Sequence, residues 1–242
     1  MKITIRSFVF AASILLLVAC QSARNSELKN ALSQELKQID EFNRAENGDV
    51  ESQFEVGLRF LHEGNYSLAK HWLELAMGNG SHQAMQSLGF MYEKGLFFDQ
   101  DYSKALALYK QSAQANLPRS LRSVGVMYRD GLGVEKDREE ALRWFQKSLD
   151  AGMPLSYADI GSLYIEGEGI EPNYSKAASY FQKGAELGEE WSLTALGLLY
   201  LEGKGVEKDT KKALSCFKRA AMRGNKIAQS RLAKLSEENN KR

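Results

Sequence analysis

The residues whose types and spacing could support catalysis are few. Ser-x-x-Lys tetrads occur in the chain, among them Ser26–Lys29 and Ser67–Lys70. In penicillin-recognising enzymes this spacing places a serine nucleophile one helical turn from a lysine. Neither tetrad is accompanied by the Lys-Thr-Gly or Ser-Asp-Asn motif that completes such a site. Ser67 also stands where a helix is expected to begin, so a role as a helix cap explains it more simply.

Metal and acyl-transfer chemistry have equally little support. The three histidines, His62, His71 and His82, form no H-E-x-x-H or H-x-x-x-H pair, and no G-x-S-x-G is present. These are the spacings that zinc sites on a helix and serine hydrolases use. We therefore expect no enzyme activity, no metal, no cofactor and no small-molecule substrate.

Binding chemistry has more support, because three arginines lie close together in one segment. Arg119, Arg122 and Arg129 are separated by three and seven residues. A guanidinium group binds a carboxylate through two parallel hydrogen bonds, which favours recognition of acidic groups. Whether the three side chains can act together depends on the element that carries them.

That element belongs to a repeat with a period of 36 residues. The stretch SVGVMYRDGLGVEKD (123–137) is similar to SLGFMYEKGLFFDQD (87–101), DIGSLYIEGEGIEPN (159–173) and ALGLLYLEGKGVEKD (195–209). Gly89, Gly125, Gly161 and Gly197 are equivalent, and a tyrosine follows each of them three residues later. A fixed period of this length is typical of a solenoid of small stacked units. The recurring Gly-x-Gly is therefore structural rather than a phosphate-binding loop.

Each repeat is predicted to be a pair of helices. In the third repeat, Leu121, Val124 and Met127 have helical spacing, and Gly131 is expected to end that helix in a left-handed conformation. Asp137, followed three residues later by Glu140, is expected to cap the second helix in the manner of a capping box. Glycine inside the first helix costs about 1 kcal/mol relative to alanine, so its recurrence predicts close contact with the second helix.

The pattern L-G-x-x-Y-x-x-G-x-G-V-x-x-D-x-x-x-A-x-x-[WY]-[FY], closed by A-x-x-G, resembles the Sel1-like repeat, a relative of the tetratricopeptide repeat. The resemblance covers residues 45–224 as five repeats, the first of which is degenerate and has a shortened loop. It departs from the pattern at Phe97, which replaces a loop glycine, and at Asn173, which replaces the loop aspartate. The resemblance implies an all-α, right-handed α-solenoid of antiparallel helix pairs that binds other proteins, and it implies no single activity.

One branch of this family carries a cysteine pair in each repeat and has been linked to penicillin binding. This chain has two cysteines, Cys20 and Cys216, and only Cys216 lies in the repeats. It occupies an aromatic position of a second helix, where a buried apolar role is expected. A hydrolase directed at the cell wall or at β-lactams stays as the alternative function, and a purely structural role in an envelope assembly as a third.

The flanks of the repeats differ from them. Residues 1–19 have a basic start and an apolar run that is too short to span a membrane, as in a secretory signal. The sequence Leu17-Val18-Ala19-Cys20 resembles a bacterial lipobox, which implies cleavage before Cys20 and its lipidation. Gln21 after the cysteine implies, by the same resemblance, the outer membrane, with the body facing the periplasm. A plain signal or an uncleaved anchor is the alternative.

The remaining segments are then assigned by composition. Residues 20–27 are predicted to be a lipidated tether, 28–44 an N-terminal capping helix, and 225–242 a C-terminal capping helix and tail. Solenoids need such caps because an end repeat would otherwise expose its apolar face. Without the signal the chain has 30 basic and 31 acidic residues. This balance does not favour nucleic-acid binding.

In tetratricopeptide-like superhelices the first helix of each pair lines the concave face. If this carries over, the candidate partner-binding residues are Gln86, Phe90, Arg119, Arg122, Arg129, Trp191 and Leu198. They would form an apolar surface with three arginines near its middle, suited to a partner segment with an acidic group. The alternative is that the leucines pack between repeats and the arginines are solvated. The sequence thus predicts a lipid-anchored scaffold of the bacterial cell envelope that binds an unidentified protein or peptide.

Overall fold

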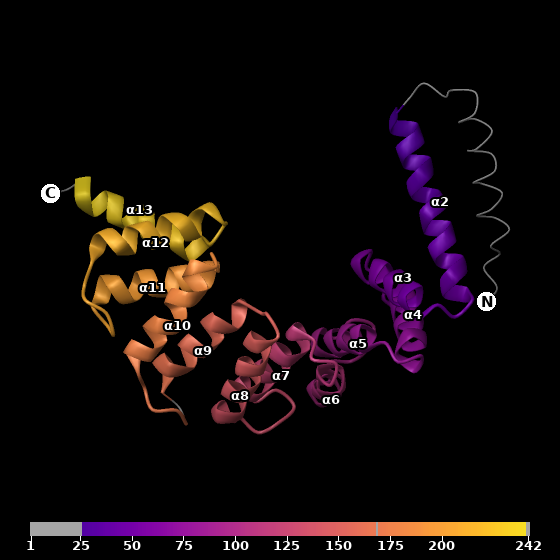
Figure 1. The fold of residues 1–242 in the computed structure, drawn as a ribbon, viewed down its shortest axis with the longest axis horizontal. Coiled ribbons are helices and arrows are strands. Elements are labelled where there is room, and N and C mark those ends of the chain that lie inside the picture. The colour runs from indigo at the N-terminus through magenta and orange to yellow at the C-terminus, as the bar shows by residue number, and fades with distance from the viewer. Residues whose placement is uncertain (1–25, 168, 241–242) are drawn as a thin grey trace. The chain divides into compact units, whose positions relative to one another are not determined.

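The computed structural model describes residues 26–167 and 169–240. The predicted signal and the lipidation site, Cys20, lie outside these ranges. The described chain is entirely helical (Figure 1). Its twelve helices are α2 (Ser26–Glu46), α3 (Val50–His62), α4 (Tyr66–Gly78), α5 (His82–Lys94), α6 (Tyr102–Ala113), α7 (Pro118–Asp130), α8 (Arg138–Asp150), α9 (Leu155–Glu166), α10 (Tyr174–Glu186), α11 (Glu190–Glu202), α12 (Thr210–Met222) and α13 (Lys226–Asn240).

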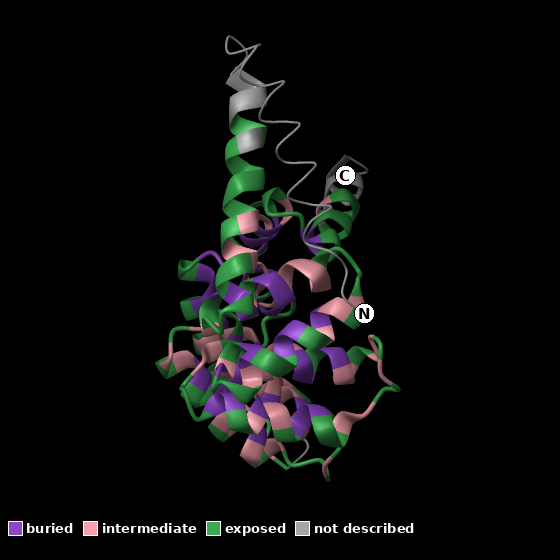
Figure 2. Cartoon of the chain, turned by 90° about the vertical axis from the view of Figure 1, so that its right-hand side faces the viewer, coloured by how far each residue is buried: buried purple, intermediate pink, exposed green. Residues whose placement is uncertain are grey.

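Two compact units make up the chain, the first ending at Ala84 and the second beginning at Met85. In the first unit, α2 and the α3–α4 pair share a small core of Ala45, Val56 and Trp72, on which Phe42 packs edge-on. Residues 33–38 of α2 are exposed (Figure 2). In the second unit, four pairs, α5–α6 to α11–α12, are followed by the single helix α13.

Close approach of paired helices explains the glycine inside each first helix. A Cβ atom on Gly161 would lie 2.5 Å from Phe181 Cε1, and one on Gly197 would lie 2.7 Å from Phe217 Cε1. Both aromatic rings are almost fully buried. The glycine and the aromatic residue therefore pack as a pair, since the aromatic ring of the second helix fills the space that a side chain on the first helix would need.

The predicted helix boundaries are confirmed in the third repeat. Gly131 ends α7 with φ 70°, and the carboxylate of Asp137 accepts a hydrogen bond from the backbone N–H of Glu140 at 2.8 Å. The second hydrogen bond of the predicted capping box, from the backbone N–H of Asp137 to the side chain of Glu140, is not formed. Glu140 instead accepts hydrogen bonds from Trp144 Nε1 and Arg143 Nε, both at 2.7 Å. The carboxylate thus orients an aromatic side chain of its own helix rather than the cap.

Two departures from the repeat pattern have distinct outcomes. Asn173 caps α10 as an aspartate would, accepting from Lys176 N. Phe97 takes the left-handed conformation of the glycine it replaces, with φ 69°, which costs a non-glycine residue about 1–2 kcal/mol. The expected cap at Ser67 is wrong, because Asn65 caps α4 and Ser67 is an exposed residue of its first turn.

Serine pairs join the second helix of one repeat to the first helix of the next. Ser112 and Ser120 are 2.7 Å apart, and Ser156 donates to Ser148 at 3.0 Å, with all four side chains fully buried. In the following repeat Gly184 replaces the first serine. Ser192 Oγ is then buried with no hydrogen-bond partner among the described residues.

None of the described helices is long and apolar enough to span a bilayer.

Candidate functional site on the first helices of repeats three to five

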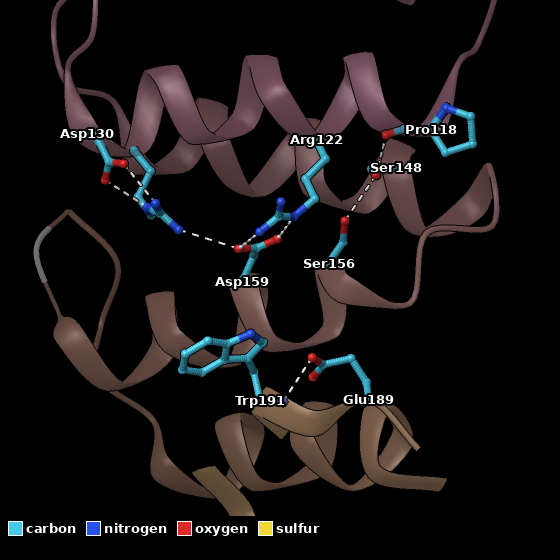
Figure 3. A network of polar contacts seen from close by, with 9 residues as sticks. Pro118, Arg122, Asp130, Ser148, Ser156, Asp159, Glu189 and Trp191 are labelled. Carbon is cyan, nitrogen blue, oxygen red and sulfur yellow. Dashed lines mark hydrogen bonds and ion pairs between the residues drawn. The ribbon is translucent and has the colours of Figure 1, made fainter. Parts of the chain in front are cut away.

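The three candidate arginines lie on α7, and Arg122 points toward Asp159 of α9 in the next repeat (Figure 3). Arg122 donates from Nε and Nη2 to the two carboxylate oxygens of Asp159, at 2.5 and 3.0 Å. Arg129 Nη1 approaches the same carboxylate at 3.4 Å. Asp159 is only 6% exposed, so a buried carboxylate contacts two arginines at once.

Arg129 is fully engaged. Its Nε and Nη2 donate to the two oxygens of Asp130, at 2.8 and 2.7 Å. This hydrogen bonding raises the pKa of Arg129, against the opposing effect of burial, and it lowers the pKa of Asp130. Carboxylates of this chain, one of them the buried Asp159 of the next repeat, thus pair with Arg122 and Arg129, and their part in binding a partner stays a prediction.

Arg119 differs from the other two. It is exposed on the first turn of α7 and forms no ion pair with any side chain that the structure describes. It lies three residues before Arg122, a spacing that places two side chains on one face of a helix. Of the three predicted arginines, Arg119 therefore carries the charge that remains for a partner, next to an Arg122 whose orientation Asp159 fixes.

Trp191 is exposed by 49% on α11. Figure 3 draws it in one view with the Arg122–Asp159 pair. Its backbone N–H is held by the carboxylate of Glu189 at 2.9 Å, so the cap of α11 positions the residue. Its indole N–H donates to no acceptor among the described residues. A large apolar side chain with an unused donor is a typical contact residue.

The other three candidates have different surroundings. Leu198 is partly buried and packs on the core formed by α10, α11 and α12, so it acts mainly between helices. Gln86 and Phe90 lie one turn apart on α5, outside the network of Figure 3. Phe90 is exposed and has the ammonium of Lys94 5.9 Å from its ring centre.

Sequence analysis missed Asp159, which organises the site. The aspartate falls at a position occupied by Ser123 in the preceding repeat and Ala195 in the following one. Comparing equivalent positions could have revealed it as a charged residue in an otherwise small, uncharged column.

Other possible sites are weaker. A cavity of about 590 Å³ is lined by Tyr128, residues 134–139 and Gly169, and it includes none of the predicted partner-binding residues. Among the described residues, no cluster of histidine, cysteine, aspartate or glutamate side chains could hold a metal ion. Cys216 is buried, and burial raises the pKa of its thiol, which disfavours the reactive thiolate.

Comparison with known proteins agrees with the repeat geometry. The Sel1 repeat family matches residues 50–81, 82–117, 118–153, 154–189 and 192–225. No curated protein matches the chain. Among solved structures, c5321, a protective antigen of uropathogenic Escherichia coli with an SLR fold, is 32% identical with a TM-score of 0.73. The match covers 82% of this chain but only 43% of that antigen.

Two further structures are similar. A Sel1 repeat protein from Oxalobacter formigenes is 31% identical, with a TM-score of 0.69, over 75% of this chain and 74% of that one. A Sel1 repeat protein from Klebsiella pneumoniae is 19% identical, with a TM-score of 0.56, over 82% of this chain and 99% of that one, and shows the fold alone. Five matched repeats, and the glycine–aromatic packing within them, show that the chain belongs to the Sel1 repeat family.

Proposed function

We propose that this chain is a non-enzymatic binding module that holds a segment of a partner protein on the exposed face of α7, α9 and α11. Sel1 repeats, like other tetratricopeptide-like repeats, are suited to binding proteins because each repeat adds a rigid helix to a continuous surface. The observation that carries the proposal is Trp191, a half-exposed tryptophan that the repeat core does not require. Its equivalents in the two preceding repeats are Leu155 and Arg119.

We propose that the module is located in the bacterial cell envelope. The lipobox-like sequence before Cys20 supports a lipid anchor, and Gln21 supports the outer membrane. Replacing Cys20 with serine tests the anchor by itself. We expect the wild-type chain in the membrane fraction and the Cys20→Ser chain uncleaved or released from it. Equal lipid labelling of both chains would contradict the anchor without affecting the binding surface.

The binding surface is tested by site-specific photo-crosslinking in living cells. The crosslinking residue is placed at Trp191 and, separately, at Arg119, because replacing Arg122 would also break its ion pair with Asp159. Lys147, exposed on the second helix α8, is the control position. We expect one dominant adduct at both test positions and none at Lys147. Identical adducts at all three positions would contradict the proposed face.

The hydrolase alternative is tested separately. Lys70 of the Ser67–Lys70 tetrad forms an ion pair with Glu74, 3.1 Å between Nζ and Oε2. A chromogenic β-lactam is incubated with the purified chain and with Ser67→Ala. We expect no turnover by either protein. Turnover that disappears in Ser67→Ala would replace the binding proposal with a catalytic one.

A further inference from the structure

Charge is distributed unevenly along the chain. Residues 204–242 contain 12 basic and 4 acidic residues, whereas residues 20–203 contain 18 basic and 27 acidic ones. The two net charges are therefore +8 and −9, although the chain as a whole is close to neutral. The basic segment runs from the end of α11 through α12 and α13, the last helices of the second compact unit (Figure 1). Such an asymmetry is typical of a chain whose basic end meets an anionic partner.

Most cations of this end are exposed and are not neutralised within the chain. The second helix α12 has four basic residues and no acidic one, whereas its equivalent α8 has three of each. Lys212 pairs with Asp209, 3.8 Å between Nζ and Oδ2. Six other cations of α12, α13 and the turn between them form no ion pair with any side chain that the structure describes: Lys211, Lys218, Arg223, Lys226, Arg231 and Lys234.

Met222, the last residue of α12, is 88% exposed, more than any other large apolar side chain that the structure describes. The equivalent residues of the three preceding repeats are Gln114, Asp150 and Glu186, all of them polar. The packing of the repeat therefore does not account for an apolar side chain at this position.

A second exposed apolar side chain lies in the neighbouring turn. Leu187 directly follows α10 and is 62% exposed. The turns after α10 and α12 touch, since a Cβ atom on Gly188 would be 2.5 Å from Nη2 of Arg223. Arg219 reaches the same turn, where its Nη2 donates to a backbone carbonyl oxygen near the end of α10 at 2.7 Å. Two turns that are 36 residues apart in the sequence thus form one surface.

We call Leu187, Lys218, Met222, Arg223 and Lys226 the basic turn surface. Lys218 precedes Met222 by four residues, which places both on one face of α12. Lys226 begins α13 directly after the turn. Two apolar side chains thus project from helix ends among three cations, a combination in which both kinds of group are exposed to the same partner.

This combination favours a lipid surface over other anionic partners. Lysine is depleted in protein–protein interfaces, yet four of the six exposed cations are lysines. A nucleic-acid backbone attracts cations but has no apolar layer in which Leu187 and Met222 could be buried. A bilayer with anionic headgroups offers both, because it attracts lysine and arginine and buries nearby apolar side chains at the boundary of headgroups and acyl chains.

We propose that the basic turn surface binds the face of a membrane that contains anionic phospholipids. Leu187 and Met222 enter the headgroup layer, and Lys218, Arg223 and Lys226 bind the phosphate groups around them. The inference goes beyond the proposed function and uses none of the predicted partner-binding residues, so each can fail without the other. It is also separable from the proposed lipid anchor, because high salt screens the charges of the surface and leaves an acyl chain in place.

A fluorophore whose emission shifts to the blue in an apolar environment tests the contact. It is attached to Met222→Cys in the purified full-length chain, in which Cys20→Ser leaves the buried Cys216 as the only other thiol. Asp150→Cys, the equivalent exposed position at the end of α8, is the matched control. Residues 1–19 are the same in both labelled chains, so any affinity of their own for vesicles does not distinguish the two labels.

The vesicles are phosphatidylcholine alone or phosphatidylcholine with about one third phosphatidylglycerol. We expect a blue shift of the label at position 222 on the anionic vesicles, little shift on the neutral ones, and loss of the shift in high salt. The label at position 150 should not shift on either kind of vesicle.

Matched variants assign the contacts through the preference for anionic over neutral vesicles, measured by co-sedimentation. Lys218→Glu with Lys226→Glu should reduce this preference at least tenfold, since each cation near an anionic surface contributes about fivefold. Lys94→Glu with Lys147→Glu makes the same change of charge at exposed positions of α5 and α8 and should reduce it much less. Met222→Ser should weaken binding to anionic vesicles severalfold. Circular dichroism verifies that each variant is folded.

Several results would overturn the inference. They are equal shifts of the two labels, equal losses in the two double variants, and vesicle binding that Met222→Ser does not weaken. A DNA duplex that binds the chain at the same salt concentration, while the label at position 222 does not respond to vesicles, would assign the basic end to nucleic acid instead.

Discussion

The junction between repeats three and four differs from the junction between repeats four and five, although both are built on the same period. At the first junction, Arg122 and Arg129 of α7 bind the buried Asp159 of α9. At the second junction the equivalent residues are Ala158, Ile165 and Ala195. The glycine–aromatic contacts that pack each pair are the same in both repeats. The scaffold therefore does not require the ion pairs, and positions between repeats can carry individual chemistry at constant backbone geometry.

The largest expected effect is the loss of the buried acid. Asp159→Ala leaves the partly buried Arg122 without its carboxylate, close to an Arg129 that keeps only Asp130, and we expect it to lower the free energy of unfolding by about 3 kcal/mol. Urea denaturation of the full-length chain measures the change. Asp130→Ala, which removes a more exposed carboxylate from Arg129, is the control and should cost less than about 1 kcal/mol. A similar cost for both variants would contradict the central role of Asp159.

Transplanting the second junction into the first should reverse most of that loss. The triple variant Arg122→Ala, Arg129→Ile, Asp159→Ala reproduces the three residues of the next repeat. Because replacing a buried ion network with packed apolar residues is often neutral, we expect stability within about 1 kcal/mol of the wild type. The measurement is the same denaturation midpoint. A triple variant no more stable than Asp159→Ala would mean that the two junctions are not interchangeable.

Two serines at equivalent positions between repeats, Ser156 and Ser192, should change stability in opposite directions when replaced by alanine, by a smaller amount. Ser156→Ala leaves Ser148 without the hydroxyl that donates to it, and we expect a loss of about 1 kcal/mol. Ser192→Ala removes a buried hydroxyl that has no partner among the described residues, so we expect a gain of up to about 1 kcal/mol. Thermal unfolding of the two variants in parallel measures the difference. Equal losses would show that Ser192 is satisfied by bound water.

The smallest expected effect is a difference between repeats four and five in how their helix caps respond to acid. Asp209 caps α12, and hydrogen bonds from the backbone N–H groups of Lys212 and Lys211 lower its pKa below 3.8. Its stabilising contribution is thus present above the unfolded pKa and is lost as pH falls through the lowered folded pKa. Asn173 caps the equivalent helix of repeat four without a titrating group. We expect Asp209→Asn to reduce the loss of melting temperature between about pH 5 and pH 2.5.

The reverse exchange is the control for the pH effect. Asn173→Asp should add acid sensitivity to repeat four over the same interval, because a carboxylate there would accept the same backbone hydrogen bond. Parallel melting curves of the two variants provide the comparison. An acid response unchanged in both variants would assign it to carboxylates other than the caps.

Much of the fold could be predicted from the sequence because its determinants are local and repeated. The 36-residue period fixes the helix pairs, Gly131 and Asp137 mark the ends of two helices, and Gly125 predicts a close contact. Repetition makes each of these signals visible several times. Local details that do not repeat were predicted less well. Asn65, not Ser67, caps α4, and Glu140 bonds to Trp144 rather than to the backbone of its cap residue.

The sequence by itself determined the family, the helix pairs and the identity of the exposed tryptophan, since each follows from comparing residues one period apart. Only the tertiary structure decided which charges remain for a partner. Arg122 and Asp159 are 37 residues apart in the chain, and their contact exists only because the third and fourth repeats stack. That stacking pairs Arg122 and Arg129 with carboxylates, whereas Arg119 stays exposed.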